Sequence, residues 1–396
     1  MASQATEPVT SERNNLGSLA NATKPESPPR DPDFYFEDGS SILLVQDVLF
    51  KVHASLLKAQ SQVFQDMFAM PSGNAVNGFE GSSDQYPIVI PQVKHPQFRN
   101  LLKMIYSPAS SAFHASLKPS SDGDCSNLEN NEWDIFTFYL DVATLCHRFG
   151  MDQMEQWAKK MLQMHISFYR EEVARGANAD PGSLLDAIQH AMTTQDHRLI
   201  RDIQHLAYHY ICASEHDLES RGLIALFRTP GLRENHPSIF GCIFSVFLRE
   251  EHPVWERESF TKVDRMALFS CQVRLSSIPE SFKKDIRSPL FEKLSSLDHV
   301  RKIIALDDLC ETPPPCSHGC DEKIMDLWRE LFEEEYYEGG VECASLAILP
   351  EYRAEFVVNA QQIRCCQGCS TRFIDQLDED IELVYVRLGE YYREIE

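Results

Sequence analysis

Residues 42–68, which read ILLVQDVLFKVHASLLKAQSQVFQDMF, decide the fold of the N-terminal region. Residues 42–45 are apolar at every position, which suits a strand buried on both faces. Gln46 and Asp47 fit a tight turn into a second strand over residues 48–52. We therefore predict a β-hairpin, although the turn lacks the favoured Asn-Gly pair.

The hydrophobic period becomes helical directly after this hairpin. Leu56, Leu57 and Ala59 mark a short helix, and Ser61 is well suited to cap the next one because its hydroxyl can accept a backbone N–H. The core face of that second helix is formed by Val63, Phe64, Met67 and Phe68.

Residues 34–166 together predict an α+β domain. A third short strand is expected over residues 88–90, and further helices are expected to begin near Phe98, Phe136 and Met151. A small sheet with surrounding helices is the usual outcome of such a pattern.

Polar segments flank and interrupt this domain. Residues 1–33 are rich in Ser, Asn, Pro and Glu, so we expect a disordered arm. Residues 71–87 and 107–131 have a similar composition with added Gly, and we expect surface loops there. The arm and the loop 107–131 hold too few apolar residues to offset the entropy of ordering, and both are predicted to be mobile.

Residues 167–396 are predicted to form an all-α C-terminal region. Apolar residues recur at helical spacing within 184–192, 199–211, 239–248, 294–304, 324–332 and 374–388. No fixed period links these segments, so we do not expect a solenoid. A Cys-rich segment covers residues 310–369.

Composition limits the classes of protein that need considering. The chain has 396 residues, enough for two to three domains, and its 43% hydrophobic and 24% charged content excludes fibrous and wholly disordered classes. A formal net charge of −23 opposes binding to nucleic acids and anionic membranes. No signal-peptide pattern opens the chain, and most of the twelve Cys are expected to be thiols, so we expect a soluble cytoplasmic or nuclear protein.

The pattern formed by Phe50, His53, Leu57, Ser61 and Phe64 resembles the BTB/POZ domain. A closer resemblance, to BTB proteins of mushroom-forming fungi, rests on FYFEDG at 34–39, EGSSD at 80–84 and PIVIP at 87–91. The resemblance covers residues 34–166 and implies an interaction domain with a long helical C-terminal extension.

The resemblance also bears on how such a domain would bind. Ser41 and Ala54 stand where animal BTB transcription factors often carry an Asp and a basic residue, so their charged dimer pocket is not expected. A swapped homodimer uses a helix before the first strand, which the prolines between residues 28 and 32 oppose. Cullin-binding members usually have a hydrophobic residue two positions before a loop Glu, whereas Asn127 precedes Glu129 here.

No catalytic signature is present in the sequence: it has no phosphate-binding Gly loop, nucleophile elbow or His-Glu-x-x-His helix. His53 is expected to pack at the strand-to-helix junction. His205 and His209 have a spacing that can hold a metal ion, but no nearby Cys or carboxylate completes a set, so a satisfied or exposed pair is expected. The acidic runs 333–335 and 378–380 are expected to be solvated helix faces, with docking of a basic partner as the alternative.

The cysteine constellation is the most specific chemical feature. Cys316 and Cys320 lie within one tight turn, as do Cys366 and Cys369, and such turns can wrap a zinc ion. Cys365 competes with its neighbour, but adjacent Cys rarely point the same way, so Cys366 is preferred. Ordinary reduced thiols and a redox disulfide are the alternatives, and no metal site is assigned from the sequence alone.

Geometry decides between these alternatives. Predicted helices over residues 321–338 and 351–363 would have to form a hairpin that brings the two turns together. Sulfurs sharing a zinc ion lie about 2.3 Å from it and under about 4 Å apart, and separations above about 7 Å would exclude zinc.

The sequence therefore predicts a non-enzymatic protein-interaction protein, acting as a scaffold or adaptor for another protein. Its alternative is a substrate adaptor of a cullin ubiquitin ligase, in which the helical region holds the substrate. A metal-binding or redox protein built on the C-terminal Cys is the third hypothesis.

Overall fold

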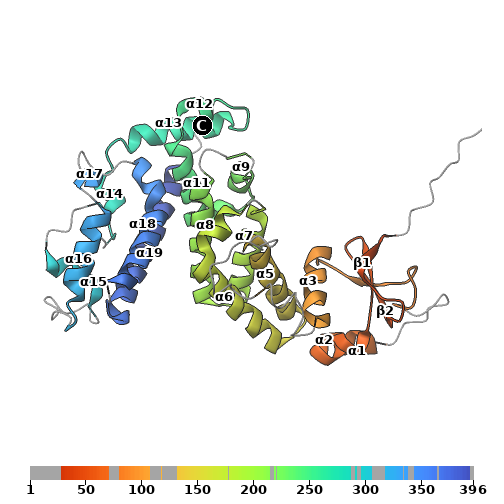
Figure 1. Ribbon diagram of the computed structural model, residues 1–396. Coiled ribbons are helices and arrows are strands. Elements are labelled where there is room, and N and C mark those ends of the chain that lie inside the picture. Colours follow the sequence, from red (N-terminus) through yellow and green to blue (C-terminus); the bar gives the residue numbers. More distant parts are fainter. Residues whose placement is uncertain are drawn as a thin grey trace, which may run out of the picture. The chain divides into compact units, whose positions relative to one another are not determined.

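The computed structural model describes residues 28–392 except 71–79, 108–116, 118–131, 177, 215–217, 220, 287–289, 292–295, 306–316, 333, 338–342 and 364 (Figure 1). The chain divides into two compact units, residues 1–105 and 106–396, here called the N-terminal unit and the helical unit. The predictions for residues 1–27 and for the loop 107–131, apart from its residues 107 and 117, lie outside the described residues.

The N-terminal unit is built on a four-stranded sheet with the order β1-β3-β2-β4. The predicted hairpin is confirmed: β2 (Ser41–Val45) pairs antiparallel with β3 (Val48–Val52), and Gln46 in the turn takes a φ of 58°. The third predicted strand, β4 (Ile88–Ile90), pairs parallel with β2. The buried strand residues form the base of the core.

A strand that the sequence did not predict completes the sheet. Strand β1 (Arg30–Tyr35) pairs parallel with β3, so the last residues of the expected arm 1–33 belong to the sheet. Asp31 holds this segment in the sheet. Its buried carboxylate accepts the N–H groups of Asp33 and Phe34 and pairs with Arg99 at 2.7 Å. Phe34 is buried as well.

Three helices cover the sheet core: α1 (Ala54–Gln60), α2 (Gln62–Ala69) and α3 (His95–Tyr106). The predicted cap is confirmed, since the Ser61 hydroxyl accepts the N–H of Phe64 at 3.1 Å. Phe64 is fully buried, and the rings of Phe50 and Phe98 meet edge to face with centroids 5.2 Å apart. The capping residue and the buried helix face predicted from the sequence therefore both occur in the structure.

The helical unit contains the remaining elements, and those after residue 166 confirm the predicted all-α region. They are α5 (Glu132–Arg148), α6 (Asp152–Arg175), α7 (Pro181–Thr193), α8 (His197–Ala213), α9 (Leu223–Phe227), α10 (Leu232–Asn235), α11 (Pro237–Arg249), α12 (His252–Trp255), α13 (Lys262–Arg274), α14 (Glu280–Lys283), α15 (Leu297–Ile304), α16 (Cys320–Leu331), α17 (Glu334–Tyr337), the 3-10 helix η2 (Cys343–Ile348), α18 (Leu349–Gln362) and α19 (Gln367–Tyr391). No helix in the described part of the chain combines the length and apolarity needed to cross a membrane.

The predicted end of the first domain, residue 166, falls inside α6. This helix continues to Arg175 and packs against both α5 and α8. The rings of Trp133 on α5 and Tyr210 on α8 lie 6.2 Å apart. Helices α5 and α6 therefore share the core of the helical unit.

Helix α11 is central to the helical unit and packs between α8 and α19 (Figure 1). Its residues from Ser238 to Leu248 are all buried, as expected of a helix that is covered on every side. Gly241 permits the closest approach, because a Cβ atom there would lie 1.7 Å from the carbonyl oxygen of Tyr385. Gly389 faces Gly241 across the same crossing.

Replacing Phe64 by Ala should destabilise the N-terminal unit by about 3 to 5 kcal/mol, because the change removes a fully buried ring and leaves a cavity. All four Trp belong to the helical unit, so their fluorescence does not report on this change. Hydrogen exchange of β2 and β3 peptides in the full chain measures it. Val63→Ala, on the exposed face of the same helix, is the control, and equal protection in both variants would contradict the assigned core position.

Replacing Gly241 by Ala should destabilise the helical unit by about 1 to 3 kcal/mol or more, because the added methyl group forces α11 and α19 apart. Urea unfolding followed by Trp fluorescence measures this loss. Gly368→Ala on the exposed first turn of α19 is the control, since it meets only the flexible end of Arg372. Equal midpoints for the two variants would show that the crossing tolerates a side chain.

Candidate functional site

Exposed apolar side chains mark the surface of the N-terminal unit. Helices α1 and α2 bury Leu57 and Phe64, yet they leave Leu56 and Val63 in solvent, and Met70 at the end of α2 is 68% exposed. Isolated exposed apolar residues are ordinary on protein surfaces. These residues matter here because the same unit also has a sheet edge that carries exposed apolar side chains.

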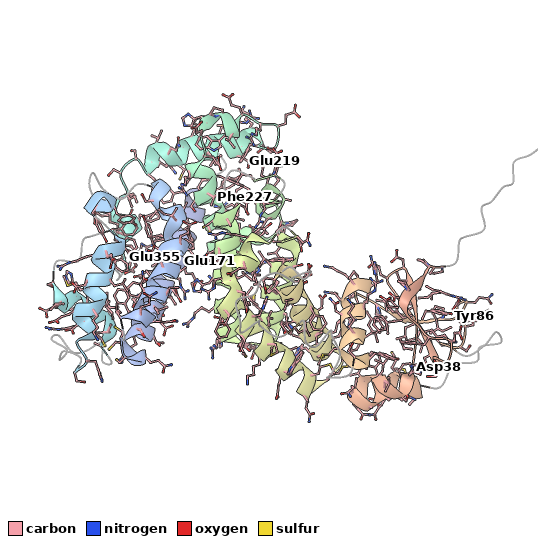
Figure 2. All side chains as sticks on the ribbon, viewed as in Figure 1. Asp38, Tyr86, Glu171, Glu219, Phe227 and Glu355 are labelled. Carbon is pink, nitrogen blue, oxygen red and sulfur yellow. The ribbon has the colours of Figure 1, made fainter. Side chains whose placement is uncertain are left out.

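Strand β4 forms one edge of the sheet and, among the described strands, pairs with β2 alone. Val89 at its centre is 57% exposed, while Ile90 points into the core. The preceding turn is fixed, because Gly81 donates its N–H to the carbonyl of Tyr86 and accepts the N–H of Ile42. Tyr86, labelled in Figure 2, is exposed beside this edge. An open strand edge with apolar side chains can accept a strand from another protein.

His53 lies at the strand-to-helix junction, as predicted. It is the residue that precedes α1, its ring lies 5.2 Å from that of Phe36, and its Nε2 atom is 3.2 Å from the carboxylate of Asp38. The bond from His53 lowers the pKa of the Asp38 carboxyl. These contacts give His53 a structural role.

Three of the four zinc candidates are brought together in the helical unit. The sulfurs of Cys320, Cys366 and Cys369 all lie within 4.8 Å of one another, far below the separation that would exclude zinc. The N–H of Cys366 also donates to the sulfur of Cys320 at 3.2 Å. Cys316 lies outside the described residues.

The hairpin that brings these thiols together differs in detail from the prediction. Helix α16 ends at Leu331 and a separate short helix, α17, follows, so the predicted helix 321–338 is divided in two. The rings of Phe332 and Trp328 stack at this end of α16 with centroids 4.2 Å apart. Helices α16 and α18 pack against each other, and both contact α19. After α18, the chain has therefore come back to the place where α16 begins.

The His205 and His209 pair is corrected by the structure in two respects. A carboxylate does lie beside His205: Asp378 of α19 is 3.0 Å from its Nε2 atom, and Arg353 of α18 binds the same carboxylate at 2.6 and 2.9 Å. His209 is buried, and its Nε2 atom has no hydrogen-bond partner among the described residues, so this histidine is neither satisfied there nor exposed.

The expectation of solvated acidic faces is wrong for Asp378 and Asp380, which are both buried. Glu379 between them is exposed, whereas the side chains of the run 333–335 lie outside the described residues. Asp378 lies seven residues before Tyr385, on the buried face of α19. The spacing of seven residues places both side chains on one helix face, which could have indicated that Asp378 is buried. We instead assigned it to the solvent because it is charged.

Burial and neighbouring charges shift the pKa values of His205, His209 and Asp378. Burial, together with the nearby Arg353 charge, lowers the pKa of His205 to about 4, and burial beside Arg170 lowers that of His209 to about 3. Burial alone would raise the pKa of Asp378, but hydrogen bonds from His205 and Arg353 hold it below its ordinary value. Both histidines are therefore neutral at pH 7.

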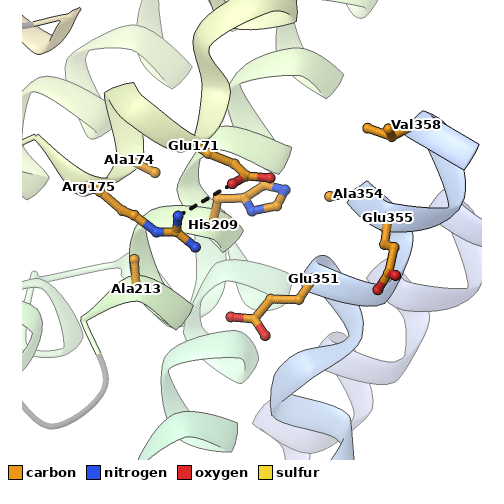
Figure 3. A pocket seen from close by; sticks show the side chains of 9 residues that line it. All are labelled: Glu171, Ala174, Arg175, His209, Ala213, Glu351, Ala354, Glu355 and Val358. Carbon is orange, nitrogen blue, oxygen red and sulfur yellow. Dashed lines mark hydrogen bonds and ion pairs between the residues drawn. The ribbon is translucent and has the colours of Figure 1, made fainter. Parts of the chain in front are cut away.

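His209 borders a pocket of about 390 Å³ between α6, α8 and α18. Figure 3 shows Glu171 bonded to Arg175 on one wall, with Glu351 and Glu355 on the other. Glu171 lies on α6 and Glu355 on α18, so the two carboxylates line the pocket from different helices (Figure 2). Three carboxylates against one guanidinium make this pocket better suited to a cation than to an anion.

Acidification should destabilise the helical unit below about pH 6.5, because the unfolded chain then binds protons that buried His205 and His209 do not bind. This stability is fully present above the unfolded pKa and is lost as the pH falls toward 4. Urea unfolding at several pH values, followed by Trp fluorescence, measures the slope. His209→Gln should reduce this slope by up to about 1.4 kcal/mol per pH unit relative to the unmutated chain. Equal slopes for the variant and the unmutated chain would contradict a neutral buried His209.

Comparison with known proteins identifies the N-terminal unit. Residues 41–119 match the family model described as the BTB/POZ domain, a match that includes β2 through α3. A comparison with curated proteins finds no match. The chain thus carries a BTB/POZ domain with a small sheet, followed by a mostly helical region.

Proposed function

We propose that this protein is a non-enzymatic scaffold or adaptor whose BTB/POZ domain binds another protein. The observation that carries the proposal is the BTB/POZ match itself, because this family consists of protein-interaction domains. The resemblance to BTB proteins of mushroom-forming fungi, and a cytoplasmic or nuclear location, belong to the same proposal.

The open edge of β4 is the binding surface we infer. A partner strand there would gain main-chain hydrogen bonds, and exposed Val89 would supply an apolar contact for specificity. Exposed apolar residues on α1 and α2 lie in the same unit and are further apolar contacts available to a partner. The net charge of −23 favours partners with a basic surface.

Val89→Glu tests this proposal in the full chain. A charge at the centre of the edge should weaken partner binding roughly 30-fold, equivalent to about 2 kcal/mol for a central contact. Affinity purification with quantitative mass spectrometry from cells that express the tagged chain measures the loss. Val273→Glu, on a 77% exposed position of α13, is the matched control.

The outcomes distinguish the partner classes. Proteins lost with Val89→Glu and kept with Val273→Glu support the proposal, and cullin peptides among them would identify a ubiquitin-ligase adaptor. Loss of self-association, measured by light scattering, would identify a second copy of this chain as the partner. An identical set of bound proteins for both variants and the unmutated chain would contradict binding at this edge.

A further inference from the structure

We propose that Cys320, Cys366 and Cys369 bind one zinc ion as thiolates. This site lies in the helical unit and is independent of the interaction proposed for the BTB/POZ domain. Zinc is chosen because three thiolates without a carboxylate form a soft ligand set.

The distances fit a site that closes around an ion. Sulfurs at about 2.3 Å from a tetrahedral zinc ion are about 3.8 Å apart, and these three already lie within 4.8 Å of one another. The three residues are up to 49 positions apart in the sequence. They meet because α18 runs back and places the beginning of α19 beside the beginning of α16. Small side-chain rotations can supply the remaining movement.

The local backbone favours negative sulfurs. Cys320 is the first residue of α16, while Cys366 precedes α19 and Cys369 lies in its first turn. The positive ends of two helix dipoles therefore meet at the cluster, and such ends stabilise thiolates. The N–H that Cys366 donates to the Cys320 sulfur acts in the same direction.

A site of this composition has definite chemistry. Binding of Zn²⁺ replaces three S–H protons, which are released to solvent, and leaves a complex with a net charge of −1. The fourth tetrahedral position takes a donor beyond these three sulfurs. The ion would fasten the start of α16 to the start of α19 and so add binding free energy to the folding of the helical unit.

Metal content of the full chain is the first test. Protein expressed with added zinc should contain one zinc ion per chain by elemental mass spectrometry, and exchange for Co²⁺ should produce a sulfur-to-cobalt charge-transfer band. Cys320→Ser and Cys369→Ser should each lose the ion. Cys365→Ser, beside the site but outside the cluster, is the matched control and should retain it.

A second measurement uses the unmutated chain, so its result does not depend on whether the Cys variants fold. Zinc should shield these three thiols from alkylation, and a chelator should expose them and lower the midpoint of Trp-monitored unfolding. Full alkylation without a chelator, a disulfide within the trio, or copper in place of zinc would overturn the proposal. Retention of zinc by Cys320→Ser together with its loss from Cys365→Ser would also overturn it.

Discussion

The close approach of α11 and α19 at Gly241 is the constraint on which the helical unit depends. No side chain separates the two backbones there, and the carbonyl oxygen of Tyr385 lies against Gly241. The hydroxyl group of Tyr385 donates its proton to the carbonyl of Leu346. The same helix then carries Asp378 to His205 and Cys369 to Cys320. The packing, the buried charges and the thiol cluster thus all follow from the position of α19.

The buried ion pair of Arg353 and Asp378 adds specificity to this arrangement. Burying two charges costs several kcal/mol per ion, and only good geometry with additional hydrogen bonds offsets that cost. Here both guanidinium bonds and the imidazole bond from His205 end on one carboxylate. A shift of α19 by one turn would leave these groups unpaired, so we expect the network to select one register.

The sequence predicted the features that depend on local chemistry. The hairpin of β2 and β3 and the cap by Ser61 follow from periodicity and capping. The approach of Cys320 to Cys366 and Cys369 was only the condition that the zinc hypothesis required, because it joins residues far apart in the sequence. Features that depend on distant partners could not be read in this way. Strand β1 is ordered by Arg99, and Asp378 is buried because Arg353 and His205 reach it.

The burial of α11 also has a consequence for synthesis. Residues 250–366 must be translated after α11 before α19 can begin to cover it, which takes roughly 6 to 23 s at about 5–20 residues per second. During that interval the apolar helix on the nascent chain lacks its main cover. We expect it to be a chaperone-binding segment, and a stop codon within α18 would leave that segment exposed to quality control.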